Sequence, residues 1–280
     1  MKPLTRASWL EAHAYLQPVA AFCAEIDRAA AEIETESPGI PSFEDYSSDF
    51  QEGVPLLQSS LARIDLEPAG KAVRSLIQKL ASASSSKRIA ADAAALDAEL
   101  RSEPEAASRR IVDWLLGDDS FTPPSPGLLR YLGWTVMSRY LHPVRTAFGR
   151  WRDDEHWLRN YCPTCGSAPA MAQLVGLEQG RKRLLLCGRC DTRWLFKRTE
   201  CPFCGNDPQR LATLGVEGEA GLRIDYCESC KGYLKAYAGE GNEAVLLSDW
   251  SSLHLDLLAH DRGLKRLAVS LYDLEPLLVT

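Results

Sequence analysis

Two near-identical runs decide the fold of this chain: Cys162-Pro163-Thr164-Cys165-Gly166 and Cys201-Pro202-Phe203-Cys204-Gly205, which recur 39 positions apart. Each run is followed by a second Cys-x-x-Cys pair, Cys187/Cys190 in the first case and Cys227/Cys230 in the second. A Cys-x-x-Cys turn, called a knuckle below, brings two sulfurs within reach of one metal ion. Two knuckles complete the tetrahedron that Zn²⁺ or iron prefers. The intervening 21 and 22 residues are close to the spacing of zinc ribbons and rubredoxin-like units.

The predicted metal ligands are the eight cysteines of the four knuckles: Cys162, Cys165, Cys187, Cys190, Cys201, Cys204, Cys227 and Cys230. We expect the first four to share one metal ion and the last four another, because the near-duplication makes each unit self-sufficient. An alternative pairs the second knuckle with the third, since only ten residues separate them. Disulfides are a further alternative. They are disfavoured because no apolar signal segment follows the N-terminus to indicate an oxidising compartment.

Local residues support the knuckle interpretation. The glycine after each first knuckle should adopt a left-handed conformation, which turns backbone N–H groups toward the thiolates. Trp194 and Tyr233 follow the second knuckle of each unit and should pack beside the metal. Cys23, the ninth cysteine, lies among apolar residues and is expected to be a small buried hydrophobe.

The first half of the chain carries helical signals. Apolar residues recur at helical spacing from Val73 to Leu80 and again from Ile89 to Leu100. Ser8-Trp9-Leu10-Glu11 has the form of a capping box, which predicts a helix start. A further helix should end at Gly117, and a helix pair should run from Leu128 to Phe148.

The predicted fold class is α+β, with an N-terminal all-α helical bundle, two tandem rubredoxin-like or zinc-ribbon units and a C-terminal helix. The expected domains are a helical domain at 1–155, a first Cys₄ unit at 156–198, a second Cys₄ unit at 199–248 and a C-terminal helical segment at 249–280. Within the second unit, Ala244-Val245-Leu246-Leu247 is predicted to be a closing strand.

Composition excludes several classes of function. The chain of 280 residues has no run of 18 or more apolar residues, so no membrane span is expected. A net charge of −6 disfavours a dedicated nucleic-acid binder. The five histidines are scattered, and no P-loop, dinucleotide fingerprint or nucleophile elbow occurs. A Cys₄ site is coordinatively closed, so we expect a binding or assembly protein and not an enzyme.

The ordered set of knuckles resembles the formate dehydrogenase accessory protein family, FdhE. The resemblance is carried by the four knuckles, by Trp194, by Tyr226-Cys227-Glu228-x-Cys230-x-x-Tyr233-Leu234-Lys235 and by Asp249-x-x-Ser252-Leu253-x-Leu255-Asp256. It implies a cytoplasmic maturation factor that binds the catalytic subunit of a respiratory formate dehydrogenase before twin-arginine export. It also implies two iron ions, one in each Cys₄ site. Spacing alone leaves zinc open in either site, because both metals accept four thiolates.

Two alternative functions remain at this point. A basic cluster in the first unit would suit a zinc-ribbon module associated with nucleic acid, and it comprises Arg181, Lys182, Arg183, Arg189, Arg193, Lys197 and Arg198. Iron in closed tetrathiolate sites would also suit a rubredoxin-like electron carrier. A structural role for the metal is favoured over a redox role, because the small ribbons have little core without it.

Overall fold

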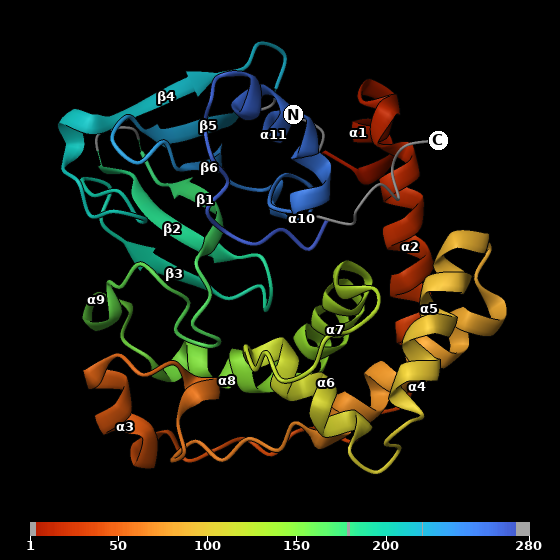
Figure 1. Cartoon of the computed structure of the whole chain (residues 1–280). Coiled ribbons are helices and arrows are strands. Elements are labelled where there is room, and N and C mark those ends of the chain that lie inside the picture. The colour runs from red at the N-terminus through yellow and green to blue at the C-terminus, as the bar shows by residue number, and fades with distance from the viewer. Residues whose placement is uncertain (1–3, 178–179, 220, 273–280) are drawn as a thin grey trace. The chain divides into compact units, whose positions relative to one another are not determined.

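The computed structural model describes residues 4–177, 180–219 and 221–272. The described chain forms two compact units that alternate along the sequence (Figure 1). The sheet unit comprises residues 4–20, 46–59 and 152–270, and the helical unit comprises residues 21–45, 60–151 and 271–272. The fold is α+β, as the sequence predicts. The four-part domain division stays a prediction, and the two compact units cut the chain at different places.

The helical unit is built around one long central helix. Its helices are the greater part of α2 (Gln17–Ala31), α4 (Glu67–Ala83), α5 (Lys87–Leu100), α6 (Ala107–Leu116), α7 (Pro126–Tyr140) and α8 (His142–Trp151). Helix α4 contacts α5, α6 and α7. The residues that the sequence places on one face, from Val73 to Leu80, are buried in this helix. The predicted stretch from Ile89 to Leu100 likewise forms α5, whose N-cap Ser86 accepts a hydrogen bond from the Ile89 amide.

The sheet unit contains one six-stranded sheet with the strand order β3-β2-β1-β6-β5-β4 (Figure 1). The strands are β1 (Pro169–Val175), β2 (Lys182–Cys187), β3 (Arg193–Phe196), β4 (Leu211–Gly215), β5 (Leu222–Cys227) and β6 (Tyr233–Ala238). Strands β1–β3 form an antiparallel ribbon, and so do β4–β6. Strands β1 and β6 then pair in parallel, from Met171 with Lys235 to Leu174 with Ala238. The two predicted units therefore merge into one sheet, which the sequence does not indicate.

Short helices complete the sheet unit. They are α1 (Arg6–Ala12), η1 (Ala14–Leu16), most of α3 (Phe43–Glu52), η2 (Leu56–Gln58), α9 (Asp154–Trp157), η4 (Pro208–Arg210), α10 (Glu243–Leu246), η5 (Asp249–Ser252) and α11 (Leu253–Asp261). The predicted C-terminal helix is α11, which contacts β5 and β6. Among the described residues, no helix combines the length and apolar character needed to cross a bilayer.

Two local predictions are wrong. The capping box lies three residues earlier than predicted, because Thr5 and Ser8 cap the start of α1 reciprocally. The closing strand predicted at Ala244–Leu247 is the helix α10. Strand β6 already has β1 and β5 as neighbours, so no edge beside it is free for a further strand. The Asn242 carbonyl instead accepts hydrogen bonds from the amides of Val245 and Leu246, which are both buried.

Candidate metal centres

The first candidate centre gathers Cys162, Cys165, Cys187 and Cys190. Their Sγ atoms lie 3.5 Å apart for Cys162 and Cys190, and 3.4 Å apart for Cys165 and Cys187. Metal–sulfur bonds of about 2.3 Å in a tetrahedron require sulfurs about 3.8 Å apart, whereas a disulfide requires about 2.05 Å. All four cysteines are free thiols and are buried. The arrangement fits one tetrahedral metal ion and does not fit disulfides.

The second candidate centre gathers Cys201, Cys204, Cys227 and Cys230. The Sγ atoms of Cys201 and Cys230 are 3.8 Å apart, and those of Cys204 and Cys227 are 3.7 Å apart. These separations also suit a tetrahedral ion such as Zn²⁺ or iron. The structure thus brings the knuckles together in the sequential pairing, and the alternative pairing of the second knuckle with the third is not seen.

The knuckle backbone has the conformation that the sequence predicts. Gly166 and Gly205 have positive φ values of 78° and 71°, which glycine adopts without strain. Asp191 and Lys231 occupy the same place after the second knuckles, with φ values of 55° and 60°. Amides of the knuckles donate to the sulfurs, as from Phe203 to Cys201 Sγ at 3.4 Å. Such donors stabilise thiolates, which are the forms that bind metal.

The first centre is covered by a segment remote in sequence. The amides of Leu56 and Leu57 in η2 donate to the carbonyl oxygens of Pro163 and Thr164, each at 2.9 Å. The side chain of Thr164 is fully buried, and its hydroxyl lies 2.8 Å from that of Thr192. The sequence gives no signal for this cover, because neither η2 nor the two threonines belongs to a recognisable motif.

The two centres differ in their exposure to solvent. Cys204 is exposed and Cys230 is half-buried, whereas no cysteine of the first centre exceeds 7% exposure. Burial raises the pKa of the Cys201 thiol to about 12. Hydrogen bonding from Asn206 lowers the pKa of Cys204 to about 7. Solvent, oxidants and partner molecules can therefore reach the second centre and not the first.

This difference predicts that the second centre releases its metal first. When metal-loaded protein is mixed with a chromogenic chelator, we expect two kinetic phases of equal amplitude. Cys204→Ser should remove the fast phase and leave the slow one, because it opens the centre that is already exposed. A slow phase that disappears in Cys204→Ser would contradict this assignment.

The basic cluster of the first unit is largely engaged within the chain. Arg183 is only 5% exposed and donates to the carbonyl oxygens of Lys197 and Glu200. Its guanidinium also lies over the Phe196 ring, 5.1 Å from the centroid. Arg193 donates to Gln173 Oε1 at 3.0 Å. These contacts give the arginines a structural role, so the motif-based support for a nucleic-acid module becomes weaker.

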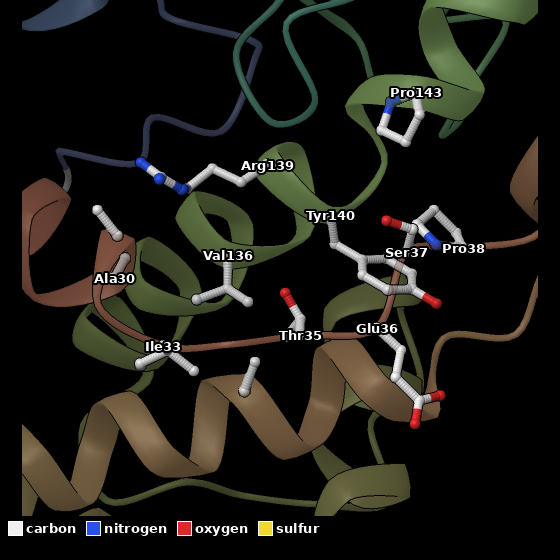
Figure 2. Close-up of a pocket in the computed structure, with 12 residues that line it drawn as sticks. Ala30, Ile33, Thr35, Glu36, Ser37, Pro38, Val136, Arg139, Tyr140 and Pro143 are labelled. Carbon is white, nitrogen blue, oxygen red and sulfur yellow. The ribbon is translucent and has the colours of Figure 1, made fainter.

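The helical unit contains a pocket of about 240 Å³ (Figure 2). It lies beside the chain from Ile33 to Pro38, and α7 contributes Val136, Arg139 and Tyr140 to its wall. Figure 2 shows the Tyr140 ring close to Ser37 and Pro38. In the described part of the chain, this pocket gathers no metal-ligating group of histidines, cysteines and carboxylates. We assign it no function.

The fold and the two centres define a class of protein: an α+β protein with a helical unit and a sheet unit that presents two tetracysteine sites able to hold metal ions. Residues 161–198, which include the whole first centre, match the family model described as "FdhE, central domain". The chain is thus similar to the FdhE proteins in this segment, which confirms the resemblance predicted from its four knuckles.

Individual proteins that are similar to this chain also carry the FdhE name. The chain is 34% identical over 145 residues to "Protein FdhE homolog" of Aquifex aeolicus, which covers 50% of each chain. It is 38% identical over 119 residues to the homolog of Pseudomonas aeruginosa, over 39% of this chain and 38% of the other. The matches thus span about half or less of the length of these relatives. The crystal structure of the FdhE protein from Pseudomonas aeruginosa superposes with a TM-score of 0.62 over 92% of this chain and 88% of the other. At 22% identity this likeness shows the fold alone.

Proposed function

We propose that this protein is an accessory protein for the maturation of a respiratory formate dehydrogenase, and that it is not itself an enzyme. It binds the catalytic subunit of that enzyme in the cytoplasm before export through the twin-arginine pathway. The observation that supports this most directly is the match of residues 161–198 to the FdhE central domain, because these residues build the complete first centre.

The two centres have different roles in this proposal. The cysteines of each centre bind one iron ion, with Zn²⁺ as the alternative, and the metal fixes the two knuckles of a ribbon to each other. The first centre is buried and covered by η2, so it maintains the fold of its ribbon. The second centre has Cys204 at the surface, so a partner protein can contact it directly.

A pocket beside the second centre supports a partner surface there. It has a volume of about 150 Å³ and is lined by Cys201, Phe203, Cys227 and Arg198. Two further guanidinium groups in its wall are engaged within the chain, because Arg183 donates to backbone carbonyls and Arg223 pairs with Asp225 at 2.8 Å. An opening that combines apolar, thiol and guanidinium groups suits an acidic or polar segment of a protein partner. We place the contact with the catalytic subunit on this side of the sheet unit.

Deletion of the gene for this protein should abolish formate dehydrogenase activity in its host while the catalytic subunit is still synthesised. Activity should return with the wild-type gene, and tagged protein should retain the catalytic subunit before export. Anaerobically purified protein should show thiolate-to-iron charge-transfer bands. Full activity in the deletion strain would overturn the proposed function, and two zinc ions per chain would overturn the assignment of iron alone.

A variant separates partner binding from folding. Arg198→Glu reverses a charge at the rim of the pocket beside the second centre, and Arg189→Glu makes the same change in the second knuckle of the first centre. If the partner docks beside the second centre, the first variant should lose the catalytic subunit and the second should keep it. Equal retention by the two variants would contradict this docking side.

A further inference from the structure

Three residues outside the cysteine centres meet in the sheet unit: His13, Glu219 and His254. His13 follows α1, Glu219 lies between β4 and β5, and His254 lies in the first turn of α11. His13 Nε2 is 3.2 Å from Glu219 Oε1, and His254 Nε2 is 2.8 Å from the same oxygen. One carboxylate oxygen therefore faces a ring nitrogen of each histidine.

The hydrogen bond of His13 fixes which of its nitrogens carries a proton. His13 Nδ1 lies 3.0 Å from the Trp9 carbonyl oxygen, which can only accept, so Nδ1 must donate. A neutral His13 then presents the lone pair of Nε2 to the carboxylate of Glu219. Two lone pairs 3.2 Å apart repel each other unless a cation lies between them, and that cation is either a proton or a metal ion.

Burial makes this arrangement costly without a cation. The side chains of His13, His254 and Glu219 are 10%, 14% and 8% exposed. Within the described residues, Glu219 Oε2 and His254 Nδ1 are buried atoms without a hydrogen-bond partner. A buried carboxylate with an unpaired oxygen needs a compensating positive charge.

We propose that His13, Glu219 and His254 form a third metal site, which binds a borderline divalent cation such as Zn²⁺. Bonds of about 2.0 Å in a tetrahedral site place neighbouring ligand atoms about 3.3 Å apart, close to the separations observed here. Two imidazoles and one carboxylate leave a coordination position for water, unlike the closed Cys₄ centres. The Trp9 carbonyl orients His13 as an outer-shell partner.

The site has a route to solvent. The Tyr15 ring lies edge-on to both imidazoles, with centroids 5.8 Å from His13 and 5.7 Å from His254. Tyr15 itself is 60% exposed, so the cluster lies just below the surface. A metal ion there would connect three segments that are remote in sequence.

A Co²⁺ titration tests this proposal when the protein has first received only two equivalents of Zn²⁺ per chain, which fill the two cysteine centres and leave the third site empty. The wild type should take up one further equivalent with weak d–d bands and no thiolate charge transfer, since the new ligands are nitrogen and oxygen. Glu219→Gln and His254→Ala should each lose that equivalent. His260→Ala, an exposed histidine on the same helix, should keep it.

The wild-type titration decides the question even if a variant fails to fold. Binding that stops when the cysteine centres are full would show that a proton and not a metal lies between the three residues, and would overturn the proposal. Retention of the further equivalent in both folded variants would place the ion elsewhere and overturn it as well. Far-UV circular dichroism identifies the variants that are folded.

Discussion

Replacement of Cys162 and Cys165 together by serine should abolish folding of the sheet unit. The first ribbon has short strands, and its two knuckles meet at the centre, beside the direct polar contact between the Thr164 and Thr192 hydroxyls. Binding of a structural metal supplies about 10 to 16 kcal/mol of apparent free energy, which matches or exceeds the total stability of an ordinary domain. Because β1 pairs with β6, loss of the first ribbon also removes a neighbour from the second. We therefore expect the effect to reach both ribbons.

Circular dichroism, metal analysis and hydrogen exchange of β6 amides measure this effect. The double variant should lose more than one metal ion per chain, and its β6 amides should exchange rapidly. Cys23→Ser is the matched control, because it makes the same atomic change at a buried cysteine outside both centres. A double variant that keeps its far-UV spectrum and the second metal would show that the first centre is not needed for folding. The role of the metal would then be redox or functional.

Lys235→Met should produce the second large effect, a loss of about 3 to 5 kcal/mol in the free energy of unfolding, as for a broken buried ion pair. Lys235 lies in β6 and is only 1% exposed. Its Nζ atom is 2.5 Å from Asp249 Oδ1 and 2.8 Å from Asp256 Oδ2. Arg266 binds the same two carboxylates at 2.7 and 3.0 Å. Methionine fills the space of the lysine stem but leaves two largely buried carboxylates, 11% and 19% exposed, with one cation.

Urea unfolding of the metal-loaded protein measures the loss. Lys197→Met is the control: Lys197 contacts Glu200 at the surface of the same unit, where an ion pair adds little to stability. Equal unfolding midpoints for the two variants would show that the buried network does not hold the sheet unit together.

The same network predicts that the free energy of unfolding decreases at acid pH. Burial acts to raise the pKa of Asp249, but Lys235 and Arg266 beside it lower that pKa well below its ordinary value. A carboxyl with a lowered pKa in the folded state stabilises the protein above its unfolded pKa of about 3.9, and this contribution is lost as the pH falls toward the folded value. Lys235→Met should therefore lose less stability between pH 5 and pH 3 than the wild type, since its carboxylate is already poorly paired.

The parts of the structure that sequence predicts are local. A knuckle needs two cysteines three positions apart and a residue that tolerates positive φ. The residues from Cys162 to Gly166 meet both conditions, so this short stretch is enough to predict the turn. Helix α4 is predicted for the same reason, since its buried face repeats along one short stretch. The gathering of each set of four cysteines follows from the duplication of the knuckles.

The parts that sequence does not predict depend on contacts between remote segments. Parallel pairing of β1 with β6 has no composition signal, because apolar strands suit many neighbours. Two of the five histidines, His13 and His254, meet at Glu219 although no spacing connects them. Nothing in the sequence indicates that Lys235 is buried. The structure shows that it is 1% exposed and that it contacts Asp249 and Asp256.

The pairing of β1 with β6 also has a consequence for synthesis on the ribosome. Strand β1 emerges about 60 residues before β6, and a ribosome adding about 5 to 20 residues per second needs several seconds to make that difference. During this interval the apolar strand from Pro169 to Val175 has an unpaired edge, which is a template for aggregation. Slow translation or a shortage of metal would lengthen the interval. The nascent chain is thus most vulnerable after its first ribbon has appeared and before its last strand has closed the sheet.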